Sequence, residues 1–190
     1  MNNKDIDNKE KIINTVIEML NEMDEPNKIT IRKIAERAGV GTGLINYHFQ
    51  TRESLLNQAV ITSMKDIASK LNFIDRNSFE NPEEKLKQII KELADIAIQN
   101  SKFLKISASY ELLQGNIQTP LYYVPLLREI YDGKKDEIEL RIIAMELNSI
   151  IQVVFLRPSA FQTYSGIDIY NKSQRDKFID ICVDNLIKTE

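Results

Sequence analysis

The sequence contains very little cysteine and histidine. Cys182 is the only cysteine of the 190 residues, so the chain can form neither an internal disulfide nor a cysteine-based metal site. His48 is the only histidine, which excludes a histidine–cysteine metal cluster, and no serine stands at a recognisable spacing from it for nucleophilic catalysis. We therefore expect no metal, no cofactor and no enzymatic activity.

Long apolar runs are also absent. No segment approaches the ~20 consecutive apolar residues that a membrane-spanning helix needs. The polar, charged N-terminus lacks the apolar centre of a signal peptide. We expect a cytoplasmic protein without a membrane partner. Because 43% of the residues are apolar and only five are proline and six glycine, the chain can bury a sizeable core.

Alternating patterns of β-branched residues are nearly absent, and apolar residues instead recur every three or four positions, as in helices. The spacing, the caps and the prolines predict helices at about 6–20, 30–38, 42–49, 51–60, 82–97, 101–113, 120–131, 134–156 and 173–188, with a loop between Pro158 and Ser173. Pro125 leaves the start of the 120–131 helix open. The predicted fold class is all-α.

Positive charge is concentrated in one segment of an acidic chain. Residues 27–52 carry five cationic side chains against Glu36, a net charge of +4, whereas the whole chain has a net charge of −3. The five are Lys28, Arg32, Lys33, Arg37 and Arg52. Such a segment is typical of nucleic-acid binding, although a charged, solvent-exposed helix would give the same count.

The same segment holds three glycines at alternate positions, Gly39, Gly41 and Gly43. A dinucleotide-binding loop would need its third glycine where Leu44 stands, and it would follow a buried strand. Here a charged, helical stretch precedes the glycines, and no Gly-Lys-Ser/Thr sequence of a phosphate-binding loop is present. A nucleotide cofactor is therefore not the expected ligand of these glycines.

A helix-turn-helix explains them better. Thr30 suits the N-cap of a first helix, Ala35 is small enough for a second helix to cross there, and Gly39 can adopt the positive φ of a tight turn. Glycines at 41 and 43 keep the start of the second helix free of side-chain bulk, so that DNA can approach it closely.

Residues 30–56, TIRKIAERAGVGTGLINYHFQTRESLL, resemble the DNA-binding domain of TetR-family transcriptional regulators. The match is dense from Thr30 to Leu55, a small part of the chain. Three residues depart from the family pattern: Gly41 stands for the usual serine, Asn46 for tyrosine and Arg52 for lysine. The first two departures remove hydroxyl groups that could contact DNA, and the third keeps the positive charge.

The resemblance implies an N-terminal three-helix DNA-binding domain at residues 1–50 and a larger helical regulatory and dimerisation domain at 51–190. Helix 42–49 would enter the major groove of double-stranded DNA, with Asn46 suited to adenine. Lys33 and Arg37 would add long-range attraction. The implied DNA contacts are Thr30, Arg32, Thr42, Gly43, Asn46, Tyr47, His48 and Arg52.

In this family the larger domain holds a small-molecule effector. Tyr110, Tyr122 and Tyr123 are the candidates for ligand contact, although aromatic residues at helical spacing are more often ordinary core. The helices at 134–156 and 173–188 are apolar on more than one face, which indicates a homodimer formed through these two C-terminal helices. A buried pair of core helices in a monomer would show the same pattern.

The expected function is a transcriptional regulator, a repressor released from a palindromic operator by a small-molecule ligand. Two other classes remain open. An enzyme would require clustered titratable groups, which the sequence does not present at recognisable spacing. A helix-turn-helix that binds a partner protein, without DNA binding, would keep its activity when the charges of Arg32 and Arg52 are removed.

Overall fold

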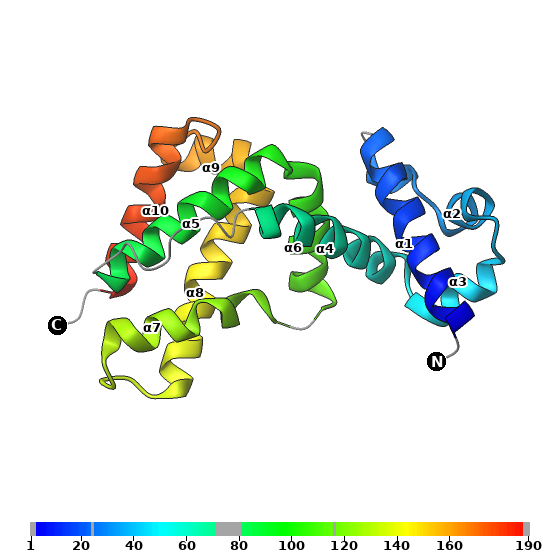
Figure 1. The fold of residues 1–190 in the computed structure, drawn as a ribbon. Coiled ribbons are helices and arrows are strands. Elements are labelled where there is room, and N and C mark those ends of the chain that lie inside the picture. Colours follow the sequence, from blue (N-terminus) through cyan, green and yellow to red (C-terminus); the bar gives the residue numbers. More distant parts are fainter. Residues whose placement is uncertain (1–2, 24, 71–80, 116, 188–190) are drawn as a thin grey trace. The chain divides into compact units, whose positions relative to one another are not determined.

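The computed structural model describes residues 3–23, 25–70, 81–115 and 117–187. Over these residues the chain forms ten α-helices, two short 3-10 helices and no strand, which confirms the predicted all-α class. The chain divides into two compact units, residues 1–74 and 75–190 (Figure 1).

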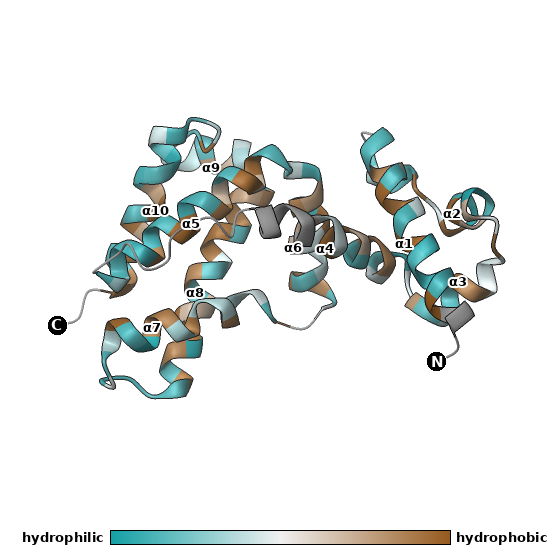
Figure 2. Ribbon diagram, in the orientation of Figure 1, coloured by the Kyte–Doolittle hydropathy of each residue, from teal (hydrophilic) through white to brown (hydrophobic). Residues whose placement is uncertain are grey.

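The first unit is built from five elements, and its core lies where α1 packs against α2 and α4. The elements are α1 (Asn3–Glu22), η1 (Pro26–Lys28), α2 (Ile31–Ala38), α3 (Thr42–Phe49) and α4 (Arg52–Lys70). Along α1 the side chains of Ile12, Val16 and Leu20 are fully buried, and the opposite face of the helix is hydrophilic (Figure 2). The spacing of three or four residues seen in the sequence therefore produces this core.

Local signals in the sequence define the helix ends of this unit. The Thr30 hydroxyl accepts a hydrogen bond from the Lys33 backbone N–H at 3.3 Å and caps α2. The Thr51 hydroxyl accepts one from the Ser54 N–H at 3.1 Å and caps α4. The cap predicted at Thr30 is confirmed, as are the bounds of the 42–49 helix. Capping side chains satisfy N–H groups that have no partner inside the helix.

The second unit surrounds α8, which packs against α6, α7, η2 and α10. Its elements are α5 (Pro82–Gln99), α6 (Ser101–Leu113), η2 (Thr119–Tyr122), α7 (Val124–Tyr131), α8 (Glu137–Leu156), α9 (Pro158–Ser165) and α10 (Lys172–Ile187). The inward residues of α8 include Leu140, Ala144 and Leu147, each almost fully buried.

Two sequence-based predictions for this unit are corrected by the structure. The single helix predicted at 120–131 is a 3-10 turn followed by α7, which begins at Val124 with Pro125 in its first turn. The loop predicted after Pro158 contains α9 instead, because proline suits the first position of a helix as well as it ends the preceding one. Of the predicted 173–188 helix, residue 188 lies outside the described residues.

By packing, α4 belongs with α1 and α3 in the first unit, which extends to residue 74. The sequence placed the functional boundary between residues 50 and 51. The division into a DNA-binding domain at 1–50 and a regulatory and dimerisation domain at 51–190 stays a prediction.

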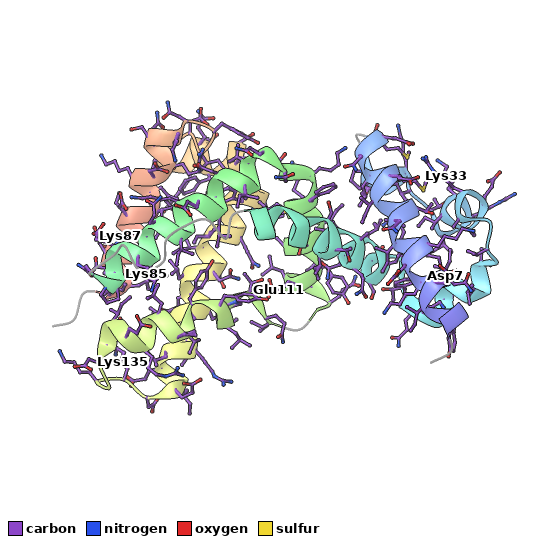
Figure 3. All side chains as sticks on the ribbon, in the orientation of Figure 1. Asp7, Lys33, Lys85, Lys87, Glu111 and Lys135 are labelled. Carbon is purple, nitrogen blue, oxygen red and sulfur yellow. The ribbon has the colours of Figure 1, made fainter. Side chains whose placement is uncertain are left out.

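A ladder of ion pairs joins α5 to the antiparallel helix α10. The Lys87 ammonium nitrogen lies 2.7 Å from an Asp184 carboxylate oxygen, and Figure 3 labels Lys87 near the start of α5. One turn further along α5, Lys91 pairs with Asp180. In the next turn the charges are reversed, because Asp95 pairs with Arg175 and with Lys172. This alternation opposes a slip of one helix along the other, since a shift by one turn would bring like charges together.

The last pair of the ladder includes a buried cation. The Arg175 side chain is only 5% exposed; it donates to the Ile169 carbonyl at 2.7 Å and to the Asp95 carboxylate. Burial alone would raise the pKa of Asp95, but the hydrogen bonds from Lys172 and Arg175 outweigh burial and hold the pKa below its ordinary value. The charged form of Asp95 is therefore the one that the fold stabilises.

We expect Asp95→Asn to lower the free energy of unfolding by about 3 kcal/mol, because it leaves the buried guanidinium of Arg175 without a counter-charge. Chemical denaturation followed by circular dichroism measures this loss. Asp176→Asn is the matched control, since Asp176 pairs only with the 61% exposed Lys172 and should cost less than about 1 kcal/mol. Equal losses in the two variants would contradict the assigned role of Arg175.

Candidate nucleic-acid interface

A tight turn at residues 39–41 joins α2 to α3. Gly39 has φ +64°, and its N–H donates to the last turn of α2, which confirms the left-handed conformation expected there. The Val40 N–H donates to the Ala35 carbonyl at 3.0 Å. Because a side chain strains this backbone conformation, glycine fits the position. Two helices of eight residues each, joined by this turn and packed together, form a helix-turn-helix.

The two faces of α3 differ sharply in exposure. Ile45 and Phe49 are buried against the first unit. The opposite face is exposed and consists of Thr42, Gly43, Asn46 and Tyr47. The spacing i, i+1, i+4, i+5 brings these four residues to one side of the helix. The structure thus groups the four residues predicted to face the groove, and their contact with DNA stays a prediction.

Gly41 and Gly43 lie beside open space. A Cβ atom added at either position would meet no atom within 4 Å. Neither glycine is therefore required for internal packing, and neither has a positive φ that a side chain would strain. The open space leaves room for a second molecule at the start of α3, and the close approach of DNA there stays a prediction.

Arg32 and Lys33 differ in how free their cationic groups are. Arg32 is exposed, and no described side chain or carbonyl is bonded to it. The Lys33 ammonium, labelled in Figure 3, donates to the Lys28 carbonyl at 3.0 Å. Arg32 is thus the more available of the two for an anionic ligand.

Arg37 has carboxylate partners within the first unit. Its guanidinium lies 2.5 Å from Glu22 and 3.3 Å from Glu18, both on α1. The hydrogen bond to Glu22 raises the pKa of Arg37 and in turn lowers the pKa of Glu22. The pair ties α2 to α1. Since two carboxylates face this cation, it adds little to the attraction of DNA that the charge count suggested.

Arg52 is the predicted DNA contact whose surroundings differ most from expectation. Its Nε donates to the Ile29 carbonyl, one Nη donates to the Pro26 carbonyl, and the other lies 3.1 Å from the Glu53 carboxylate. The side chain is 23% exposed. Arg52 therefore joins the start of α4 to the turn that precedes α2, and a contact with DNA stays a prediction for its remaining N–H groups.

His48 is half-buried, and its Nε2 atom is buried without a hydrogen-bond partner. The imidazole ring lies between the rings of Tyr47 and Phe49, with centroid separations of 5.1 and 6.0 Å. Donation to a phosphate, as predicted, would have to come from Nδ1 in this conformation.

Two lysines of α1 also lie near the helix-turn-helix, and the sequence pattern does not predict them there. The Lys9 ammonium lies 5.7 Å from the centre of the Phe49 ring, and the Lys11 ammonium lies 3.9 Å from the position that a Gly39 Cβ would take. The only signal in the sequence is their place on the polar side of α1, which does not reveal the neighbour that this side meets.

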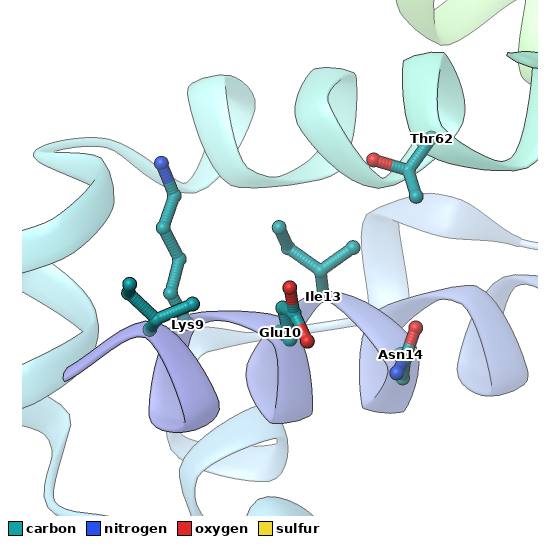
Figure 4. Close-up of a pocket in the computed structure, with 6 residues that line it drawn as sticks. Lys9, Glu10, Ile13, Asn14 and Thr62 are labelled. Carbon is teal, nitrogen blue, oxygen red and sulfur yellow. The ribbon is translucent and has the colours of Figure 1, made fainter. Parts of the chain in front are cut away.

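A cavity of about 390 Å³ lies between α1 and α4 (Figure 4). Ile6 and Ile13 form its apolar part, and the polar lining residues are Lys9, Glu10, Asn14 and Thr62. None of the three tyrosines predicted to bind a ligand lines it.

Those three tyrosines lie in different environments. Tyr123 is buried, and burial together with the negative charge of Glu111 raises its pKa to about 12. Tyr122 points outward and is 82% exposed. Tyr110 is half-buried, and its ring leaves no room for a side chain at Gly115, where a Cβ would lie 2.9 Å from a ring carbon. Their role in ligand binding stays a prediction.

Within the described residues, no group of three histidine, cysteine, aspartate or glutamate side chains could hold a metal ion. Cys182 is buried, which raises the pKa of its thiol to about 11. Among the helices described, none is long and apolar enough to cross a membrane.

Comparisons with known proteins agree with this geometry. Residues 26–59 match the family model described as bacterial regulatory proteins, tetR family. The nucleoid occlusion factor SlmA of Vibrio cholerae serotype O1 is 23% identical over 161 residues, which cover 76% of this chain and 80% of that protein.

Two solved structures share the fold. A TetR transcriptional regulator from Rhodococcus sp. RHA1 has a TM-score of 0.68 at 12% identity, with 96% of each chain covered. The transcriptional regulator FadR from Bacillus subtilis, solved in complex with stearoyl-CoA, has a TM-score of 0.58 at 17% identity, with 94% of this chain and 97% of that chain covered.

The open space at Gly43 predicts that folding and DNA binding respond in opposite directions to one substitution. Gly43→Ala should raise the free energy of unfolding by about 0.5 kcal/mol, because alanine loses less backbone entropy in a helix. The added methyl group should weaken DNA binding. Urea denaturation and fluorescence anisotropy with labelled DNA measure the two effects, and unchanged DNA affinity would show that close approach at Gly43 is not needed.

Arg52 and Arg32 give a second matched pair. We expect Arg52→Ala to lower the free energy of unfolding by about 2 kcal/mol, because the Ile29 and Pro26 carbonyls each lose the hydrogen bond that Arg52 donates. Arg32→Ala should leave stability within about 0.5 kcal/mol of the parent and weaken DNA binding about tenfold. Urea denaturation and anisotropy distinguish the two roles. A stable Arg52→Ala variant would contradict the structural role given to Arg52.

Proposed function

Because this chain belongs to the TetR family and is a DNA-binding transcriptional regulator, we propose that it acts as a homodimeric repressor, released from a palindromic operator by a small-molecule ligand. The observation that carries the proposal is the exposed outer face of α3, where Asn46 and Tyr47 stand beside two glycines that border open space.

In the proposed complex α3 lies in the major groove. Asn46 can pair with adenine through its carboxamide, and Tyr47, 75% exposed, can donate to a phosphate. Arg32 supplies a free cation at the start of α2, and the Thr30 hydroxyl stands one residue before that helix. His48 and Arg52 would contribute through the N–H groups that the fold leaves unused. Base contacts give the sequence preference, and phosphate contacts give most of the affinity.

Pairing of two copies is supported by α8. Its inward face is buried in the second unit, yet its outward face exposes a stripe of large apolar residues, Ile138, Ile142, Met145, Ile150 and Val153. On α10, Ile181 is exposed as well. A core pair in a monomer would bury these side chains. Two copies joined here would present two α3 helices to successive major grooves, about 34–36 Å apart.

Release from DNA by a ligand can be explained by a shift in the populations of two dimer conformations. A ligand that binds better to the dimer whose α3 helices are wrongly spaced lowers the fraction able to bind DNA, by no more than its difference in affinity for the two states. Residues 51–190 would form the regulatory and dimerisation domain, with Tyr110, Tyr122 and Tyr123 as candidate contacts. Since the similar FadR structure contains stearoyl-CoA, acyl-CoA thioesters are the first ligands to test.

Selection of random duplex DNA by the purified chain, followed by a salt titration on the enriched sequence, tests the proposal. We expect a palindrome whose affinity falls steeply as salt rises, because phosphate contacts release counterions. Asn46→Ala should relax the preference at one base position in each half-site, whereas Arg32→Ala should weaken all sequences alike. Enrichment without two-fold symmetry would reject the dimeric operator.

Addition of acyl-CoA to the bound complex then tests release. Repression itself is read from a reporter gene placed behind the selected operator, where deletion of the regulator should raise expression. If deletion of the regulator lowers expression instead, the chain acts as an activator.

A further inference from the structure

A second apolar surface lies at the end of α6 and on η2. We call it the α6–η2 patch; its exposed residues are Leu112, Leu113, Ile117, Leu121 and Tyr122. Leu113 is 79% exposed and Tyr122 is 82% exposed. The segment 112–122, LLQGNIQTPLY, contains no charged residue, although 28% of the chain is charged. Several exposed apolar side chains within one uncharged segment are typical of the central part of a protein interface.

The backbone under this patch is held by a single carboxylate. Glu111, labelled in Figure 3, accepts hydrogen bonds at 2.8 Å from the N–H groups of Gln118 and Thr119. It also accepts one from the Thr119 hydroxyl at 2.7 Å and one from the Gln152 side chain of α8 at 2.8 Å. Tyr123 is buried behind the patch while its neighbour Tyr122 points outward. The start of η2, which carries Leu121 and Tyr122, is therefore held in place, so that less entropy is lost when a partner covers these two side chains.

The patch borders the outward face of α8. Gln152 lies seven residues, or about two helical turns, after Met145 on α8. Residues at this spacing lie on the same side of a helix, so Gln152 is near the edge that carries Met145. Glu111 bonds to Gln152 at this edge, and η2 packs against α8. The apolar stripe of α8 and the α6–η2 patch are thus adjacent.

The size of a stable interface favours a second copy of this chain as the occupant. Such interfaces bury roughly 20–30 residues on each side. The outward faces of α8 and α10, both fully described, expose nine and six residues, which is fewer than such an interface needs. On α10 only one large apolar side chain, Ile181, is exposed. A dimer formed through α8 and α10 would therefore need further contact surface, and the adjacent patch can supply it. DNA does not suit the patch, because a polyanion requires cations that segment 112–122 lacks.

We propose that the α6–η2 patch is part of the dimer interface and packs against the second copy beside the α8 stripe. This inference rests on the proposed homodimer and widens its interface beyond the two C-terminal helices. Tyr122 is its principal contact residue, since a rigid, exposed tyrosine contributes large contact area at low entropic cost.

Sedimentation equilibrium of the full chain tests the proposal. We expect Leu113→Asp/Tyr122→Asp to raise the dimer dissociation constant at least tenfold, because two carboxylates would be buried without partners. Leu93→Asp/Tyr170→Asp is the matched control, since it changes one exposed leucine on α5 and one exposed tyrosine before α10, and it should leave the constant within twofold. Equal constants for the two double variants would overturn the proposal.

Two further arms separate this inference from the proposed homodimer. Ile142→Asp/Val153→Asp on α8 should also weaken the dimer. If it does while the patch variant does not, the wider interface is wrong and the homodimer stands. If the unmodified chain is monomeric at every concentration, both are wrong.

Hydrogen exchange on the unmodified chain avoids the risk that a variant misfolds. Amides of residues 112–122 should exchange more slowly at concentrations above the dissociation constant than below it, in parallel with amides of α8. Protection of α8 without protection of 112–122 would overturn the proposal.

Discussion

In both units a shielded guanidinium donates to backbone carbonyls of a turn and fixes the helix that starts or ends nearby. Arg52 does this for the turn at Pro26 and Ile29, and Arg175 does it for Ile169. Short helices joined by tight turns leave carbonyl groups without intrahelical partners, and an unpaired buried carbonyl is costly. The planar fork of arginine reaches two acceptors at once, which a lysine does not. The placement of the start of α4 and of the start of α10 depends on these two side chains.

Local features of this fold could be read from the sequence. Thr30, Gly39 and Thr51 act within four residues of their own positions, so caps and turn follow from residue type alone. The Glu22 partner of Arg37 and the two carbonyl partners of Arg52 lie 15 to 26 residues away, and no spacing rule predicts them. A count of charges treats every cation as free in solvent, and for this reason it overstated the basic character of residues 27–52. The helix after Pro158 was missed because proline both ends one helix and begins the next.

Few polar and cationic groups of the first unit are free to contact DNA, and the helices that carry them are held together by ion pairs. Arg32 and the outer face of α3 are free, while the cations around them hold α1, α2 and α4 together. In the proposed complex, affinity at this surface depends on few side chains, and the pairing of two copies multiplies it. The interface between the copies thus matters as much for recognition as the residues that touch bases.

At the two glycines that border open space, a substitution can alter recognition without altering the stability of the fold. At most positions of a small helical unit, a substitution that alters recognition also alters packing, so that a new preference has to survive a loss of stability. At Gly41 and Gly43 a new side chain would meet solvent in the free protein and would meet DNA only in the proposed complex. Descendants of this gene can therefore explore new target sequences through these two codons while the fold stays intact.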